Sequence, residues 1–201
     1  MNARQEILQR IHTALADRPE AVSIVRDYHL AGSRPVDVDI FAERVADYRA
    51  TVYRCAAADA RDCIDEMLRS HSITEVALPQ GFPTHWEPSV QLTAEPVSVP
   101  ELDRISAVIT TCSVGIEQTG TIVLDAGPGQ GARMLTLVPD YHLIVITEDQ
   151  VVAAVPDAIA ALDPTRPQTW ISGPSATSDI ELRRVEGVHG PRTLDVLLVA
   201  R

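Results

Sequence analysis

A glycine-rich stretch in the middle of the chain is the first place where the sequence could do chemistry. Five glycines fall within residues 115–131, namely Gly115, Gly120, Gly127, Gly129 and Gly131. Glycine allows close backbone approach, so exposed amides here could bind an anion, with Arg133 adding a charge. The spacing is not G-x-G-x-x-G before a helix, which disfavours a dinucleotide site. A pair of tight turns explains the same glycines equally well, and both interpretations stay open.

A second polar loop, residues 172–181, directly follows a predicted strand. Hydroxyls and backbone amides in this loop could hold an anionic or hydroxylated ligand, and the residues concerned are Ser172, Gly173, Ser175 and Thr177. Asp179 and Glu181 come next and join the candidate ligand contacts, although acids at the start of a helix also cap its amides and favour its dipole. The loop is therefore a second candidate for substrate binding.

Two histidines are candidate proton carriers. His189 stands between Gly187 and Gly190, on a turn, which suits an exposed acid or base. His142 precedes a buried strand, and the alternative for it is a core histidine bonded to a loop carbonyl. These two histidines are 47 residues apart, and their spacing points to no third metal ligand, so we name no metal-binding residue, and metal binding itself stays open. A G-x-S-x-G nucleophile elbow is also missing from the sequence.

The charged residues exclude several classes of function. All 17 basic residues are arginine, and the formal net charge is −11. Because the chain has no lysine, it cannot form a lysine Schiff base with a substrate or cofactor, and it lacks the lysine of a P-loop ATPase. An acidic chain with no basic run lacks the local positive charge that nucleic acid or an anionic membrane requires, so we expect neither as a partner.

The cysteines limit the redox chemistry that this chain could do, and the apolar segments indicate where in the cell it works. The three cysteines, Cys55, Cys63 and Cys112, form no C-x-x-C pair, so we expect no cofactor, iron–sulfur cluster or zinc in this chain. The first residues contain no apolar signal region, and no apolar run approaches the roughly 20 residues that span a bilayer. A cytoplasmic protein is expected.

These candidates need a scaffold, and the hydrophobic pattern predicts an α/β one. Residues 1–18 contain an amphipathic helix, residues 19–36 read as a connector, and residues 37–201 form the main domain. In that domain, we predict helices over residues 37–50, 56–70 and 151–162, and strands over residues 51–55, 75–78, 107–111, 121–124, 143–146, 168–171 and 194–199. The proline-rich residues 79–100 are expected to be loop with at most short strands. This alternation predicts a Rossmann-like, mostly parallel sheet with flanking helices, which binds ligands at the carboxyl ends of its strands.

Three strings together resemble the LUD-domain family, in its lactate-utilisation branch. They lie at residues 119–131, 137–142 and 171–191, and their order and spacing cover about residues 105–200. The resemblance implies the fold shared by NagB, ribose-5-phosphate isomerase and the coenzyme A transferases. It also implies two companion proteins, A and B, which oxidise L-lactate to pyruvate and carry the iron–sulfur clusters.

One departure from the family pattern concerns the residues before Thr119. The family usually has an acid immediately before Thr-Gly-Thr, whereas here that position is Gln118 and the acid is Glu117. One residue reverses the face of an extended segment, so Glu117 is not assumed to replace that acid. Gln118 can bind a ligand but cannot act as a base. We count residues 118–121 among the expected substrate contacts, and they are Gln118, Thr119, Gly120 and Thr121.

The leading hypothesis is a component of a cytoplasmic lactate-oxidising system that binds a small carboxylate. Whether this chain itself is catalytic stays open. Lactate oxidation releases two electrons, so a chain without an evident cofactor motif needs a partner. The alternatives are a non-catalytic anion-binding or regulatory module, and an independent transferase or ligase of the wider fold.

Overall fold

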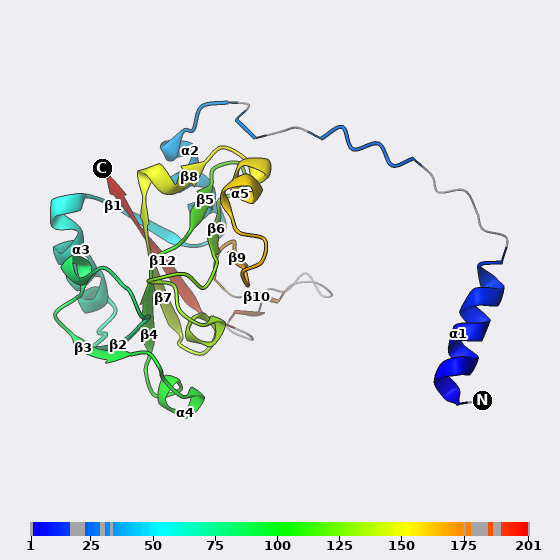
Figure 1. Cartoon of the computed structure of the whole chain (residues 1–201). Coiled ribbons are helices and arrows are strands. Elements are labelled where there is room, and N and C mark those ends of the chain that lie inside the picture. The colour runs from blue at the N-terminus through cyan, green and yellow to red at the C-terminus, as the bar shows by residue number, and fades with distance from the viewer. Residues whose placement is uncertain are drawn as a thin grey trace.

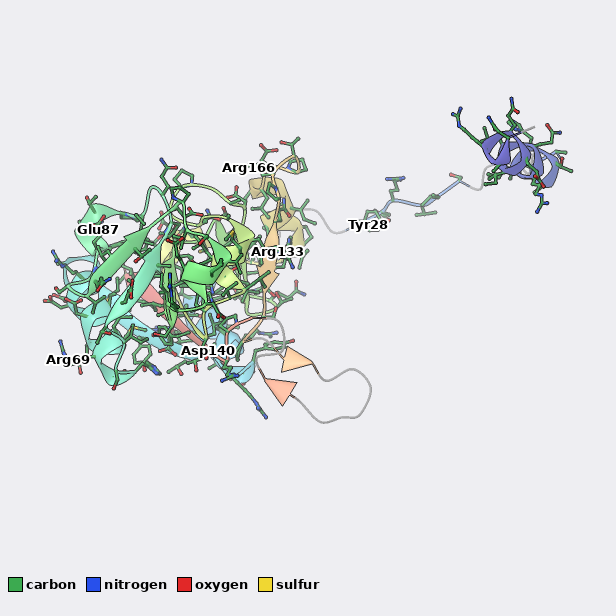
Figure 2. All side chains as sticks on the ribbon, turned by 90° about the horizontal axis from the view of Figure 1, so that it is seen from below. Tyr28, Arg69, Glu87, Arg133, Asp140 and Arg166 are labelled. Carbon is green, nitrogen blue, oxygen red and sulfur yellow. The ribbon has the colours of Figure 1, made fainter. Side chains whose placement is uncertain are left out.

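The computed structural model describes residues 2–16, 23–28, 31–32, 34–174, 176–177, 185–186 and 190–200. The first helix, α1 (Ala3–Ala14), begins with a capping box between Asn2 and Gln5, and none of its residues is buried. Figure 1 shows α1 standing away from the body of the molecule, and Figure 2 labels Tyr28 on the extended segment between them. The amphipathic pattern of α1 is therefore not covered by the main domain.

The body is built on a six-stranded parallel sheet in the order β1-β12-β7-β4-β2-β3. The strands are β1 (Thr51–Ala56), β2 (Glu75–Leu78), β3 (Gln91–Ala94), β4 (Ala107–Thr110), β7 (Tyr141–Thr147) and β12 (Thr193–Ala200). The predicted α/β fold with a mostly parallel sheet is confirmed. The two central strands, β7 and β12, consist almost entirely of buried residues because both of their faces are covered.

A second sheet of four strands, in the order β8-β5-β6-β9, packs beside the first. Its strands are β5 (Val114–Ile116), β6 (Thr121–Leu124), β8 (Val151–Val152) and β9 (Thr169–Ile171). β5 and β6 form an antiparallel hairpin, so the glycines at 115 and 120 do belong to a turn-containing excursion. A short antiparallel pair, β10 (Ala176–Thr177) and β11 (Val185–Glu186), follows β9.

Helices cover the two faces of the parallel sheet (Figure 1). On one face, α3 (Ala60–Ser70) packs Ile64 and Leu68 against β4, β7 and β12. On the other face, Phe41 and Val45 of α2 (Val38–Asp47) pack with β6, β7 and β12. α5 (Val155–Ala161) covers the second sheet through Ala158. The resulting layers leave the carboxyl ends of the parallel strands free for a site. No helix in the described part of the chain is both long and apolar enough to cross a membrane.

Two sequence predictions differ in part from the structure. The helix predicted over residues 151–162 is wrong in its first turn, because residues 151–152 are strand β8, paired with β5, and the helix begins at Val155. Pro156 does not interrupt this helix but lies in its first turn, where its missing N–H costs nothing. Residues 79–100 contain the short strand β3, as expected, but also a 3-10 turn (Thr84–Trp86) and the start of the short helix α4 (Val99–Leu102), whose first turn accepts Pro100.

Candidate functional site

The chain changes direction between β2 and β4. It leaves β2 toward β3, at the sheet edge, and leaves β4 toward β7, on the opposite side. Where neighbouring parallel strands send their connections in opposite directions, a crevice opens at their carboxyl ends, and α/β proteins bind ligands there. A cavity of about 580 Å³ lies at this point and is lined by segments that follow β2, β3 and β6. We call it the switch-point cavity.

The glycine-rich loop after β6 forms one wall of the switch-point cavity. Gly127, Pro128 and Gly131 line it, facing Gly81 from the loop after β2. Gly129 takes a positive φ of 75°, and a Cβ there would lie 2.6 Å from the Thr111 hydroxyl oxygen. Glycine is required because the loop passes so close to the end of β4.

Many of the loop's amides are already bonded within the chain. Gly127 N donates to the Asp125 carboxylate at 3.1 Å, Gly129 N to the Gln80 carbonyl at 2.8 Å, and Gln130 N to the Gly127 carbonyl at 3.0 Å. The expectation that exposed amides of residues 127–131 form an anion-binding nest is therefore corrected for these three groups. These three amides are used by the fold itself, and the glycines bring the loop close to its neighbours.

Glu95 is the ionisable residue that lines the switch-point cavity. It follows β3 directly, and its two carboxylate oxygens accept from two different loops. Oε1 accepts from Ala132 N at 3.0 Å, and Oε2 accepts from Gln80 N at 3.2 Å. The carboxylate is therefore held in place between the loops after β2 and β6. Sequence reasoning missed Glu95 because it lies in the proline-rich stretch and belongs to no recognisable motif.

A second cavity, of about 300 Å³, contains Arg133 and adjoins the first. The two cavities share Ala126, Gly131 and Ala132 in their walls. Arg133 is exposed and forms no ion pair with a carboxylate in the described part of the chain. Figure 2 shows Arg133 on the same side of the body as Arg166, away from Arg69 and Glu87. We call this space the Arg133 cavity, and its free guanidinium suits a carboxylate.

Two other polar side chains near the Arg133 cavity, those of Gln130 and Asp125, are engaged in holding its walls. Gln130 accepts from Asp125 N at 2.6 Å and donates to the Ser113 hydroxyl at 2.9 Å. Arg166 pairs with Asp125 at 3.0 Å, and the Asp125 side chain is 9% exposed. These contacts fix the segment after β6 against the segment before β9. Arg133 is thus the charged side chain in the lining of this cavity, and it has no ion-pair partner among the described residues.

A separate cluster forms at the other end of β6. Thr119 Oγ1 donates to Thr121 Oγ1 at 2.7 Å, and Thr121 Oγ1 lies 2.9 Å from Ser172 Oγ. Gly120 and Gly173 pack against the end of α2, where a Cβ would lie 2.5 Å from the Arg44 carbonyl carbon and 2.2 Å from the Tyr48 carbonyl oxygen. The structure therefore brings together these five predicted contacts, but away from Arg133, and the two glycines let the end of α2 approach the second sheet.

Glu117 and Gln118 take different roles at the β5–β6 turn. Glu117 is 1% exposed, and it accepts from Arg34 Nη1 at 2.6 Å and from Asp37 N at 2.8 Å. Gln118 is exposed, and its carbonyl accepts from Arg44 at 2.5 Å. Glu117 therefore anchors the segment that enters α2. It does not face either cavity.

His142 lies inside the parallel sheet, on β7. It is 1% exposed, its Nε2 lies 2.8 Å from Thr110 Oγ1, and its Nδ1 has no partner in the described structure. Burial lowers the pKa of His142 to about 3, so the ring is neutral near pH 7. His142 lines neither cavity, and this placement is that of a core histidine, bonded to a strand hydroxyl instead of a loop carbonyl.

Some predicted site residues fall outside the described residues, namely Ser175, Asp179, Glu181 and His189. Thr177 lies on β10, for which only the backbone is described. Within the described part of the chain, no group of three or more His, Cys, Asp or Glu side chains is arranged to hold a metal ion.

Comparisons with known proteins give the relationships of the chain. A family model described as the LUD domain matches residues 38–199. A protein named lactate utilization protein C from Deinococcus radiodurans is 42% identical over 98% of this chain and 95% of its own length. Another of that name, from an Exiguobacterium species, is 26% identical over the same shares. The crystal structure of a DUF162 family protein from Deinococcus radiodurans superposes with a TM-score of 0.70 at 36% identity, covering 82% of this chain and 99% of that one.

Proposed function

The chain belongs to the LUD domain family, and we propose that it is a component of a lactate utilisation system that oxidises L-lactate to pyruvate. In this proposal the chain binds a small carboxylate in the Arg133 cavity and acts with iron–sulfur companion proteins. The observation that carries the binding step is the Arg133 guanidinium, which has no ion-pair partner among the described residues and lines a cavity at the carboxyl-end side of the sheet.

The relatives support the wider role. The two proteins named lactate utilization protein C align along nearly the whole of this chain, so the resemblance includes the segments that build both cavities. The solved DUF162 structure, at 36% identity and with a TM-score of 0.70, shares the overall fold of this chain. The proposal therefore joins a role taken from relatives to a binding group found in this structure.

The cysteines support the need for a partner. Cys55 lies on β1, Cys63 lies on α3, and Cys112 follows β4, so they come from three different elements. A cluster held by four thiolates needs more cysteines than this chain has. The two electrons from lactate are therefore passed, in this proposal, to clusters in the companion proteins.

The proposal is tested by measuring lactate-dependent dye reduction with the companion proteins, with and without this chain. We expect activity to fall when the chain is omitted and to return when it is added. Arg133→Ala should restore at most about a tenth of the activity, because it removes a charge-assisted contact to the carboxylate. Arg61→Ala is the control, because Arg61 is an exposed arginine on α3 that lines neither cavity. Full activity without the chain would reject the subunit role, and full activity of Arg133→Ala would reject the site.

A further inference from the structure

We propose that Glu95 makes this site selective for a 2-hydroxy acid over the corresponding 2-oxo acid, by accepting a hydrogen bond from the hydroxyl group. The inference rests on the proposed function, in which Arg133 binds the carboxylate of the same ligand. It adds a second recognition group, at the wall between the two cavities, and it states which of substrate and product the site prefers.

The first step is the position of Glu95 relative to Arg133. Glu95 Oε1 is 3.0 Å from the backbone nitrogen of Ala132, the residue directly before Arg133. Ala132 and Gly131 belong to the walls of both cavities. The anionic group of one cavity and the cationic group of the other therefore flank one short stretch of backbone, although they form no ion pair with each other.

The second step is that the Glu95 carboxylate keeps unused acceptor capacity. Each oxygen accepts one backbone N–H, from Ala132 and from Gln80, and a carboxylate offers about four acceptor positions. Glycine at position 131 keeps this group approachable, since a Cβ there would lie 3.1 Å from Glu95 Oε2. A ligand at the wall that the two cavities share can therefore reach the carboxylate.

The third step is the chemistry of the two ligands. A carboxylate is only an acceptor, so it binds a hydroxyl group, which donates, and disfavours a keto oxygen, which cannot. L-Lactate and pyruvate carry the same carboxylate and differ at this one oxygen. One hydrogen bond to a charged group corresponds to about a tenfold to hundredfold difference in affinity. Arg133 alone would not distinguish the two acids.

A structural role for Glu95 is the competing explanation, because the carboxylate also joins two loops. Loss of such a clamp would weaken both ligands together, whereas loss of a hydroxyl acceptor changes the ratio of their affinities. The ratio of the two Kd values is therefore the informative measurement.

The test is calorimetric titration of the full-length chain with L-lactate, pyruvate and 2-methoxypropionate, which keeps the carboxylate but has no hydroxyl donor. We expect the wild type to bind L-lactate at least about tenfold more tightly than either of the others. Glu95→Gln should bring the ratio of lactate to pyruvate affinity close to one, and Arg133→Ala should weaken all three ligands. Arg61→Ala should match the wild type, and thermal unfolding checks that each variant folds.

Each result decides the inference. Equal wild-type affinities for L-lactate and 2-methoxypropionate would overturn it even if Glu95→Gln does not fold. An unchanged ratio in a folded Glu95→Gln variant, or an equal loss for both acids, would also overturn it while leaving the proposed function standing. Failure of the wild type to bind any of these acids would overturn the inference together with the carboxylate site.

Discussion

The ion pair between Arg34 and Glu117 offers the sharpest test of how the site is supported. Glu117 is almost fully buried, with 1% of its side chain exposed, whereas the Arg34 side chain is 41% exposed. Replacing Arg34 by Met keeps much of the aliphatic stem and removes the guanidinium. Glu117 then keeps only the contact to Asp37 N, and the Ala153 carbonyl loses its donor from Arg34 at 2.9 Å.

The expected cost follows from the burial of the remaining charge. Removing one partner of a fully buried pair costs about 3–5 kcal/mol, and the exposure of Arg34 lowers this because water reaches the site. We therefore expect Arg34→Met to lower the free energy of unfolding by about 2–3 kcal/mol. For a chain of this length, that corresponds to a fall in Tm of about 4–12 °C.

The assay is urea unfolding followed by circular dichroism, together with thermal scans, for Arg34→Met, Glu117→Gln and the double variant. Because both single changes disturb one interaction, the double variant should cost less than their sum by about 1 kcal/mol. Arg54→Met is the matched control, since Arg54 pairs with Asp39 at 2.5 Å while both side chains stay well exposed. That pair should contribute less than about 1 kcal/mol. A loss for Arg34→Met no larger than for Arg54→Met would refute the reasoning.

Three further predictions concern other parts of the fold. Burial lowers the pKa of His142 to about 3 against about 6.5 in the unfolded chain, so the folded state stays neutral while the unfolded state binds a proton as pH falls. Between pH 7 and pH 5, urea titrations should show the wild type losing about 2 kcal/mol more stability than His142→Gln, and equal losses would contradict this. Gly173→Ala should cost about 2–4 kcal/mol, because φ is 78° and the new Cβ would lie 2.2 Å from the Tyr48 carbonyl oxygen. Gly32→Ala is its control, with φ of 82° and no atom within 4 Å, and similar costs for the two would argue against the clash. Burial raises the pKa of the Cys55 thiol to about 12, so iodoacetamide at pH 8 should modify it more than about a hundredfold more slowly than a free cysteine. Mass spectrometry of peptides checks this, and a rate near that of free cysteine would disprove it.

Much of the scaffold was predictable because local pattern and tertiary structure agree. The strands at residues 75–78 and 121–124 were expected at their observed bounds, and the apolar run at 143–146 lies inside β7. Residues 151–152 show where such reasoning stops. Two valines directly before a helix could belong to the helix or to a strand. They form a strand here because β5 is available as a pairing partner.

The candidate site was predictable only in part. The glycines at 127, 129 and 131 and the arginine at 133 were visible because glycine spacing and a lone cation are local properties of the sequence. Their neighbours were not visible. Glu95 comes to the site through the crossover from β3 to β4, a contact between residues 37 positions apart.

By itself, the sequence determined the class of the domain, its lack of lysine chemistry and its need for a cation at any anion-binding site. The tertiary structure decided which predicted residues share a site. It separated Thr119 and Ser172 from Arg133 and placed His142 in the core. It also placed the Glu117 carboxylate at the start of α2, where it accepts from Asp37 N. The physical reason is that hydrophobic periodicity depends on neighbours along the chain, whereas the cavities depend on segments far apart in sequence. The switch-point cavity forms where the ends of β2 and β3 meet the loop after β6, and the Arg133 cavity forms where that loop meets the start of β9.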